Sequence, residues 1–137
     1  MNLTGKRFIS ANKGWDMDDR YVLVVDDEEI IRQTLCEMIV LFGKDCECAE
    51  NGESAIKIVG ENPKKYQAVF LDLSMPGLDG TETLARLQDI VPDLPVYIVS
   101  GYGGDELEEQ LASKGIAGIL AKPFGIEELK QIIDGLD

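Results

Sequence analysis

Short apolar runs alternate with segments of helical periodicity along most of this chain, and this alternation limits the fold more than any other feature. The clearest runs are five or six residues long: YVLVV at 21–25, which is rich in valine, AVFLDL at 68–73 and PVYIVS at 95–100. Continuous apolar runs of this length are typical of strands buried on both faces. Two weaker runs, DCECA at 45–49 and AGILA at 117–121, bring the number of predicted strands to five.

Between these runs, apolar residues recur three and four positions apart, which is the period of a helix with one buried face. This pattern predicts five helices. The first covers about 28–41, the second is a short helix around 55–59 that ends near Gly60, and the third follows Thr81. The fourth lies around 105–111, and the fifth runs from 126 to the end of the chain. Strands that alternate with helices form a parallel sheet with helices on both faces, because each crossover is right-handed. The predicted fold is therefore a doubly wound α/β domain with five parallel strands.

The length of 137 residues is sufficient for one such domain. Residues 1–20 show no clear period and are interpreted as an N-terminal tail or linker, so the domain is predicted to cover 21–137. No apolar run approaches the roughly 20 residues that cross a bilayer, and the first residues lack the features of a signal peptide. We therefore expect a cytoplasmic protein that does not bind membranes.

The charge and the missing histidines exclude several functions. The chain carries a formal charge of −13, and its 13 Lys and Arg residues are scattered, which argues against direct binding of nucleic acid. It contains no histidine, so catalytic triads and histidine-bound metals are excluded. Cys36, Cys46 and Cys48 form neither an even disulfide framework nor a full set of zinc ligands. We interpret them as small buried apolar side chains.

Polar residues stand where the predicted strands end. Asp26 and Asp27 follow the first strand, while Asp72, Ser100 and Lys122 lie at the ends of the third, fourth and fifth. In a doubly wound sheet these ends share one edge, where ligands bind. Three carboxylates in one place repel one another unless a cation lies between them, and oxygen ligands suit Mg²⁺. The lysine and the hydroxyl could then contact a phosphoryl group attached to Asp72. The Lys122–Pro123 peptide bond is a candidate for the cis form.

Four segments, VLVVDDEE, AVFLDLSMPGLDG, VYIVSG and AKPF, resemble the receiver domain of bacterial two-component response regulators. The resemblance covers about residues 21–136 and implies a flavodoxin-like (βα)5 fold. It implies that Asp72 is the phosphoacceptor, and that Asp27, assisted by Asp26, and the main-chain carbonyl of Ser74 bind Mg²⁺, for which Mn²⁺ can substitute. It further implies that Lys122 pairs with the phosphoryl group and that Ser100 is the switch hydroxyl.

The resemblance also predicts the partners. With no histidine in the chain, the phosphoryl group must come from a histidine kinase, a histidine phosphotransfer protein or a small acyl phosphate. The protein is then a switch that promotes changes in its own phosphorylation, not an enzyme acting on other molecules. The fourth and fifth predicted helices are rich in acids (Asp105, Glu106, Glu108, Glu109, Glu127, Glu128 and Asp134). We therefore expect a downstream protein target with a basic surface.

Two positions depart from what is often found in the family. Ile119 stands where many members have Tyr or Phe, three residues before the lysine, so aromatic coupling at this position is in question. Tyr102 is larger than many residues found two positions after the switch hydroxyl, and it could shield the acyl phosphate from water. Both are candidate modulators, although packing is the favoured explanation for each of them.

Several alternatives stay open at this point. Taken alone, Asp26 and Asp27 could cap a helix, and Asp72 could belong to a turn. An aspartyl-phosphate phosphatase of the haloacid dehalogenase type needs a second Asp two residues after the nucleophile, where this chain has Ser74. A flavin binder lacks support, since no phosphate-binding turn follows the first strand. The sequence could also be a receiver module of a hybrid histidine kinase or multidomain regulator.

Overall fold

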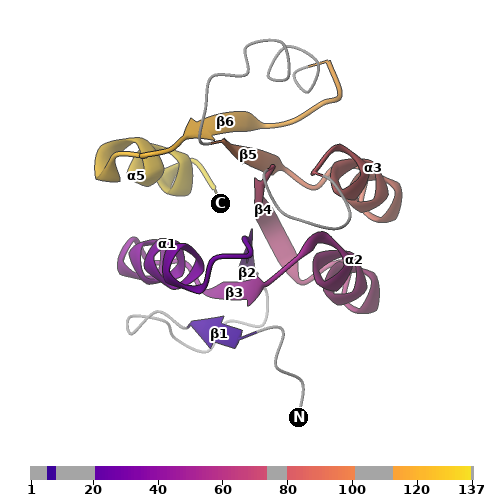
Figure 1. Ribbon diagram of the computed structural model, residues 1–137, viewed down its shortest axis with the longest axis horizontal. Helices are drawn as coiled ribbons and strands as arrows, with labels where there is room; N and C mark the ends of the chain where they lie inside the picture. The colour runs from indigo at the N-terminus through magenta and orange to yellow at the C-terminus, as the bar shows by residue number, and fades with distance from the viewer. Residues whose placement is uncertain (1–5, 9–20, 74–79, 101–112, 137) are drawn as a thin grey trace.

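One six-stranded sheet forms the centre of the structure (Figure 1), which is a computed structural model that describes residues 6–8, 21–73, 80–100 and 113–136. The strand order is β1-β3-β2-β4-β5-β6. The strands are β1 (Lys6–Phe8), β2 (Tyr21–Val25), β3 (Cys46–Ala49), β4 (Tyr66–Asp72), β5 (Val96–Ser100) and β6 (Gly118–Ala121). The described helices are α1 (Glu29–Leu41), α2 (Gly52–Glu61), α3 (Gly80–Ile90) and α5 (Ile126–Asp134).

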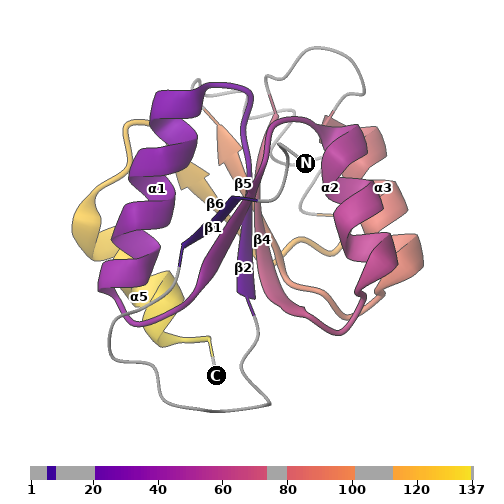
Figure 2. The same cartoon turned by 90° about the horizontal axis from the view of Figure 1, so that it is seen from below.

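The helices cover both faces of the sheet. Helices α1 and α5 lie on one face and α2 and α3 on the other, as the view along the strands shows (Figure 1) and the turned view confirms (Figure 2). The side chains of β2 alternate between two separate apolar cores. Val22 and Val24 pack toward α1 and α5, whereas Leu23 and Val25 pack toward α2 and α3. This double burial is the reason that the strand reads as a continuous apolar run.

The five parallel strands and the helices on both faces confirm the fold predicted from the sequence. The helix predicted around 105–111 lies outside the described residues. Strand β1 was not predicted, and it lies within the segment interpreted as a tail, where it pairs antiparallel with β3. Three residues are too few to show a period, so this edge strand has no signal in the sequence. The domain boundary at residue 21 stays a prediction. In the described parts of the chain, no helix is long and apolar enough to cross a membrane.

Two glycines of α2 provide a test of how its face packs against α3. A Cβ atom at Gly52 would overlap Oγ1 of the buried Thr83, whereas a Cβ atom at Gly60 would meet only Ile90 Cδ1, at 3.9 Å. We expect Gly52→Ala to lower the free energy of unfolding by about 1–3 kcal/mol because of overpacking. Gly60→Ala, the matched control, should raise it by roughly 0.5–1 kcal/mol through helix propensity. Urea unfolding measures both changes, and a neutral Gly52→Ala would show that α2 and α3 adjust at no cost.

Candidate functional site

The two central strands bring acidic residues to one edge of the sheet. Asp26 directly follows β2, and Asp72 is the last residue of β4. These strands are neighbours, with Val25 in register with Leu71. The chain leaves β2 toward β3 on one side, while β4 lies on the other, so the strand order reverses at this point. Ligands of doubly wound sheets bind in the crevice formed there.

Three carboxylates meet at this edge. Oxygen atoms of Asp26, Asp27 and Asp72 all lie within 4.8 Å of one another. Asp26 and Asp72 are each only 2% exposed, whereas Asp27 is exposed to solvent. The group is therefore open on one side and closed by the protein on the other. Acids that only increase solubility would not be buried in this way, because burying a charge is costly unless it is compensated.

Lys122 lies beside two of these acids. It directly follows β6, and its backbone N–H donates to the carbonyl of Ser100 at 2.7 Å. Its Nζ atom lies 3.3 Å from Oδ2 of Asp26 and 3.5 Å from Oδ2 of Asp72. Burial disfavours the charged ammonium group, but the two carboxylates outweigh this effect and raise the pKa of Lys122. The lysine therefore remains a fixed positive charge at this edge.

Several contacts fix Asp26 in place. Its Oδ1 accepts from the backbone N–H of Glu28 at 2.9 Å, and its carbonyl accepts from Nη1 of Arg32 at 2.8 Å. Burial and the nearby charge of Asp72 raise the pKa of Asp26, against the opposing effects of the Glu28 N–H and Lys122. The N-cap of α1 is Glu28, whose side chain makes no cap hydrogen bond. Neither Asp26 nor Asp27 is therefore the N-cap residue of α1.

The remaining predicted residues have different outcomes. Ser100 ends β5 on the same edge, one position beyond Val99, the register partner of Asp72. Ile119 lies in β6 and packs against the apolar core on the side of α2 and α3. Ser74 and Tyr102 lie outside the described residues.

The Lys122–Pro123 peptide bond is cis, as the sequence suggested. The contact of Arg32 was missed, because nothing in the sequence indicates which partner a helical arginine selects.

The side chains at this edge fit a hard divalent cation. The donors are carboxylate oxygens, which Mg²⁺ prefers, and the open side at Asp27 leaves room for water or phosphate oxygens. The three acids outnumber the one lysine beside them. A divalent cation would remove the repulsion that remains among the carboxylates.

Comparison with known proteins places the chain among signalling proteins. The family model of the response regulator receiver domain matches residues 22–134. The response regulator MprA of Mycobacterium sp. (strain KMS) is 34% identical over 110 residues, which cover 79% of this chain and 46% of MprA. The sensor histidine kinase RcsC of Escherichia coli (strain K12) is 30% identical over 118 residues, which cover 86% of this chain and 12% of RcsC. The chain thus spans about half or less of the length of these relatives.

Solved structures agree with the sequence relatives. A response regulator receiver domain protein from Clostridium thermocellum has a TM-score of 0.80 at 27% identity, with 84% of this chain and 91% of that chain covered. The receiver domain of the Francisella response regulator 1452 has a TM-score of 0.76 at 30% identity, with 85% and 94% covered. Receiver domains generally bind Mg²⁺ at an acidic pocket and interact with histidine kinases and downstream effectors. The buried acids, the lysine and these likenesses together show that the chain belongs to the response regulator receiver domain family.

Proposed function

We propose that this receiver is a phosphoryl-accepting switch and that the carboxylate of Asp72 is the acceptor. One observation carries the proposal: Asp72 is 2% exposed at the end of β4, within the group of three carboxylates, with Lys122 Nζ 3.5 Å from its Oδ2. A buried carboxylate beside a fixed cation and a cluster of metal-binding oxygens is suited to hold a phosphoryl group. The lysine and a bound metal ion would both offset the negative charge that this group adds.

The other side chains have complementary roles in this proposal. Asp27, with Asp26 assisting, and the main-chain carbonyl of Ser74 hold Mg²⁺ or Mn²⁺, and a bound Mg²⁺ neutralises charge on the transferred phosphoryl group. Lys122 pairs with a phosphoryl oxygen, and the Ser100 hydroxyl donates to another after it moves toward Asp72. The phosphoryl group adds about −1.5 to −2 charge at neutral pH, which changes the preferred positions of both residues.

The phosphoryl donor in this proposal is another protein or a small acyl phosphate, because the chain contains no histidine of its own. A histidine kinase or a histidine phosphotransfer protein is the expected donor. The product is a change in the state of this protein, not a released molecule, so it acts as a switch and not as an enzyme. An aspartyl-phosphate phosphatase would need a titratable acid-base group two residues after Asp72, where Ser74 stands.

A second candidate differs in context and not in chemistry. The likeness to the sensor histidine kinase RcsC, of which this chain spans 12%, favours a receiver module within a larger kinase. The likeness to MprA favours a module of a response regulator. Both relatives are longer than this chain. Determining what the complete reading frame encodes would show whether the receiver belongs to a kinase or to a response regulator.

Phosphorylation by a small donor tests the proposal directly. We expect acetyl phosphate or phosphoramidate to add one phosphoryl group per chain, about +80 Da, when Mg²⁺ is present and not when it is chelated. Intact-mass spectrometry measures the number of groups, and peptide mapping after borohydride reduction locates the acyl phosphate. More than one group per chain, equal addition without metal, or a modified residue other than Asp72 would contradict the proposal.

The exposed face of α5 supports a basic downstream partner. Glu127 and Glu128 are exposed on its first turn, and the charge of Lys130 is paired with Asp134 at 2.6 Å. A symmetric dimer across this face would set acid against acid, so we expect phosphorylation to favour binding to a basic surface on another protein. Exposed charges are screened over about 8 Å at physiological ionic strength, so the binding should weaken with salt. Sedimentation of the beryllofluoride-activated protein at low and high salt provides the test, and a tight dimer on this face at low salt would refute the expectation.

A further inference from the structure

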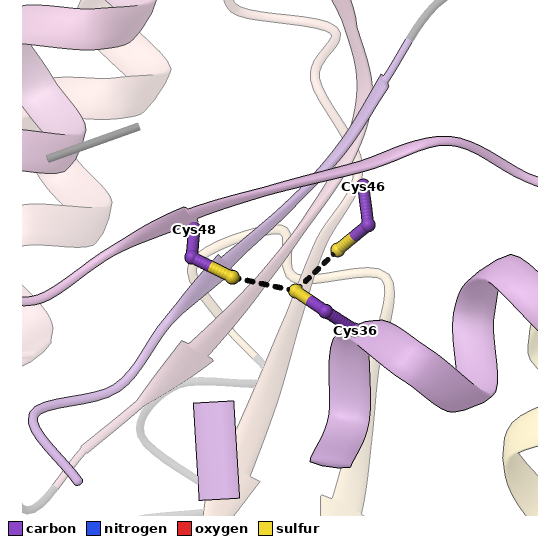
Figure 3. A group of neighbouring side chains, drawn as sticks. All are labelled: Cys36, Cys46 and Cys48. Atoms are coloured by element: carbon purple, nitrogen blue, oxygen red, sulfur yellow. Dashed lines mark hydrogen bonds between the residues drawn. The ribbon is translucent and has the colours of Figure 1, made fainter. Parts of the chain in front are cut away.

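Three cysteine side chains from two elements meet in the core between α1 and the sheet (Figure 3). Cys36 lies on α1, while Cys46 and Cys48 lie two residues apart on β3, so that both strand side chains point to the same face. Sγ of Cys36 lies 2.6 Å from Sγ of Cys48 and 2.6 Å from Sγ of Cys46. Cys36 is therefore the common neighbour of both strand cysteines.

Burial in an apolar core is only one property of these three thiols. The sequence favoured small buried apolar side chains, and the structure does bury all three cysteines in the apolar core as reduced thiols. In addition, Sγ of Cys36 is in direct contact with the sulfur atoms of both strand cysteines. The three thiols are thus placed for chemistry between themselves and not only for packing.

Zinc lacks a full set of ligands at this cluster. Zinc takes four ligands, and among the described residues no fourth His, Cys, Asp or Glu joins the three thiols. Three thiolates around a cation would also bury net negative charge among apolar side chains.

We propose that Cys36 is the centre of an oxidation site, at which a two-electron oxidant such as a peroxide joins it to Cys46 or Cys48 through an intramolecular disulfide. Each strand sulfur already contacts Sγ of Cys36, so either of them can form the S–S bond of about 2.05 Å with it. Cys46 and Cys48 are not expected to pair with each other. Their Cα atoms, two residues apart on one strand, are separated by roughly 6.6 Å, near the limit that a disulfide spans.

The chemistry balances with peroxide as the electron acceptor. Cys48 is 4% exposed and the other two thiols are fully buried, so Cys48 meets the oxidant first. Its sulfur attacks the peroxide, the O–O bond breaks, and a sulfenic acid and one water form. The sulfur of Cys36 then displaces the sulfenic oxygen as a second water, so that two thiols have together lost two electrons and two protons. Cys46 can exchange into this disulfide at Cys36 and release Cys48.

Burial makes the reaction slow. It raises the pKa of the Cys36 thiol and of the Cys46 thiol well above the ordinary value, because a thiolate is unfavourable in an apolar core. Since the thiolate is the nucleophile, oxidation is expected to be slower in the folded protein than at an exposed cysteine. The site would therefore respond to sustained oxidation and remain reduced otherwise.

Treatment of the folded chain with hydrogen peroxide or diamide, followed by denaturation and alkylation with N-ethylmaleimide, tests the proposal. We expect one alkylated cysteine per oxidised chain where the reduced chain has three, and peptides in which Cys36 is joined to Cys46 or Cys48. Cys46→Ser should keep the Cys36–Cys48 pair, and Cys48→Ser the Cys36–Cys46 pair. Cys36→Ser should form no intramolecular disulfide.

Each contrary result would overturn the proposal. A Cys46–Cys48 pair, disulfides between chains, sulfinic acids in place of a disulfide, or three free thiols after prolonged exposure of the folded chain to excess oxidant would each do so. Cys46→Ser and Cys48→Ser keep the test valid even if Cys36→Ser fails to fold. Asp72→Asn is the matched control for the proposed function, because it should oxidise like the unaltered protein whether or not Asp72 accepts a phosphoryl group.

Discussion

Asp72→Asn is expected to abolish phosphoryl transfer from acetyl phosphate to this protein. The asparagine side chain has nearly the same shape as aspartate but lacks the anionic oxygen that attacks phosphorus. Because Asp72 is buried beside Asp26, the substitution also removes one of two like charges and should leave the fold intact. The expected change in intact-mass spectra is complete loss of the added phosphoryl group at a donor concentration that saturates the unaltered chain.

A matched control separates this effect from the loss of any acid. Asp93 is exposed after α3 and is not part of the group of three carboxylates, so Asp93→Asn should label like the unaltered protein. Circular dichroism of Asp72→Asn confirms that the fold is kept. Labelling of Asp72→Asn at the level of Asp93→Asn would show that the phosphoryl group goes elsewhere, and the assignment of the acceptor would have to be abandoned.

The sequence predicted the architecture well because each central strand is buried on both faces. Such strands read as short apolar runs, and the polar residues that follow them must lie on one edge of the sheet. The meeting of Asp26, Asp72 and Lys122 at this edge follows from that geometry alone. Strand β1 could not be predicted, because its three residues form a strand only by pairing with the edge of β3.

Contacts that depend on how a helix is rotated relative to the sheet could also not be predicted from the sequence. The spacing of Cys46 and Cys48 shows that both point to one face, but the position of Cys36 between them depends on how α1 is turned. The same rotation places Arg32 on the carbonyl of Asp26. The different burial of Asp26 and Asp27 was likewise not predicted, since the two acids are adjacent and identical in type.

Mg²⁺ is expected to stabilise the unphosphorylated protein strongly, and this gain should depend on Asp27. A ligand that binds only the folded state adds RT ln(1 + [L]/Kd), which is about 2.7 kcal/mol when its concentration is about 100 times Kd. For a domain of this size the corresponding rise in Tm is roughly 10 °C. Thermal melts in Mg²⁺ and in EDTA measure the difference between the bound and the free protein.

Two substitutions at the acidic edge should differ in their melting temperatures in EDTA. Asp27 is exposed, so Asp27→Ala should melt close to the unaltered protein without metal, whereas Asp26→Asn should melt higher because it removes a buried charge beside Asp72. Lys122 keeps Asp72 as a partner in the second variant. Both variants should lose most of the gain from Mg²⁺, because each removes one of the three carboxylates.

Glu29→Ala is the matched control for these melts. Glu29 is an exposed acid in the first turn of α1, two residues from Asp27, and it lies outside the group of three carboxylates. Removing it changes the net charge as much as Asp27→Ala does. If Mg²⁺ acted only through general electrostatics, the rise in Tm would therefore be reduced equally in both variants. A specific site predicts a full Mg²⁺ shift for Glu29→Ala and almost none for Asp27→Ala. If Asp27→Ala keeps the shift, the divalent cation binds somewhere other than the edge formed by Asp26, Asp27 and Asp72.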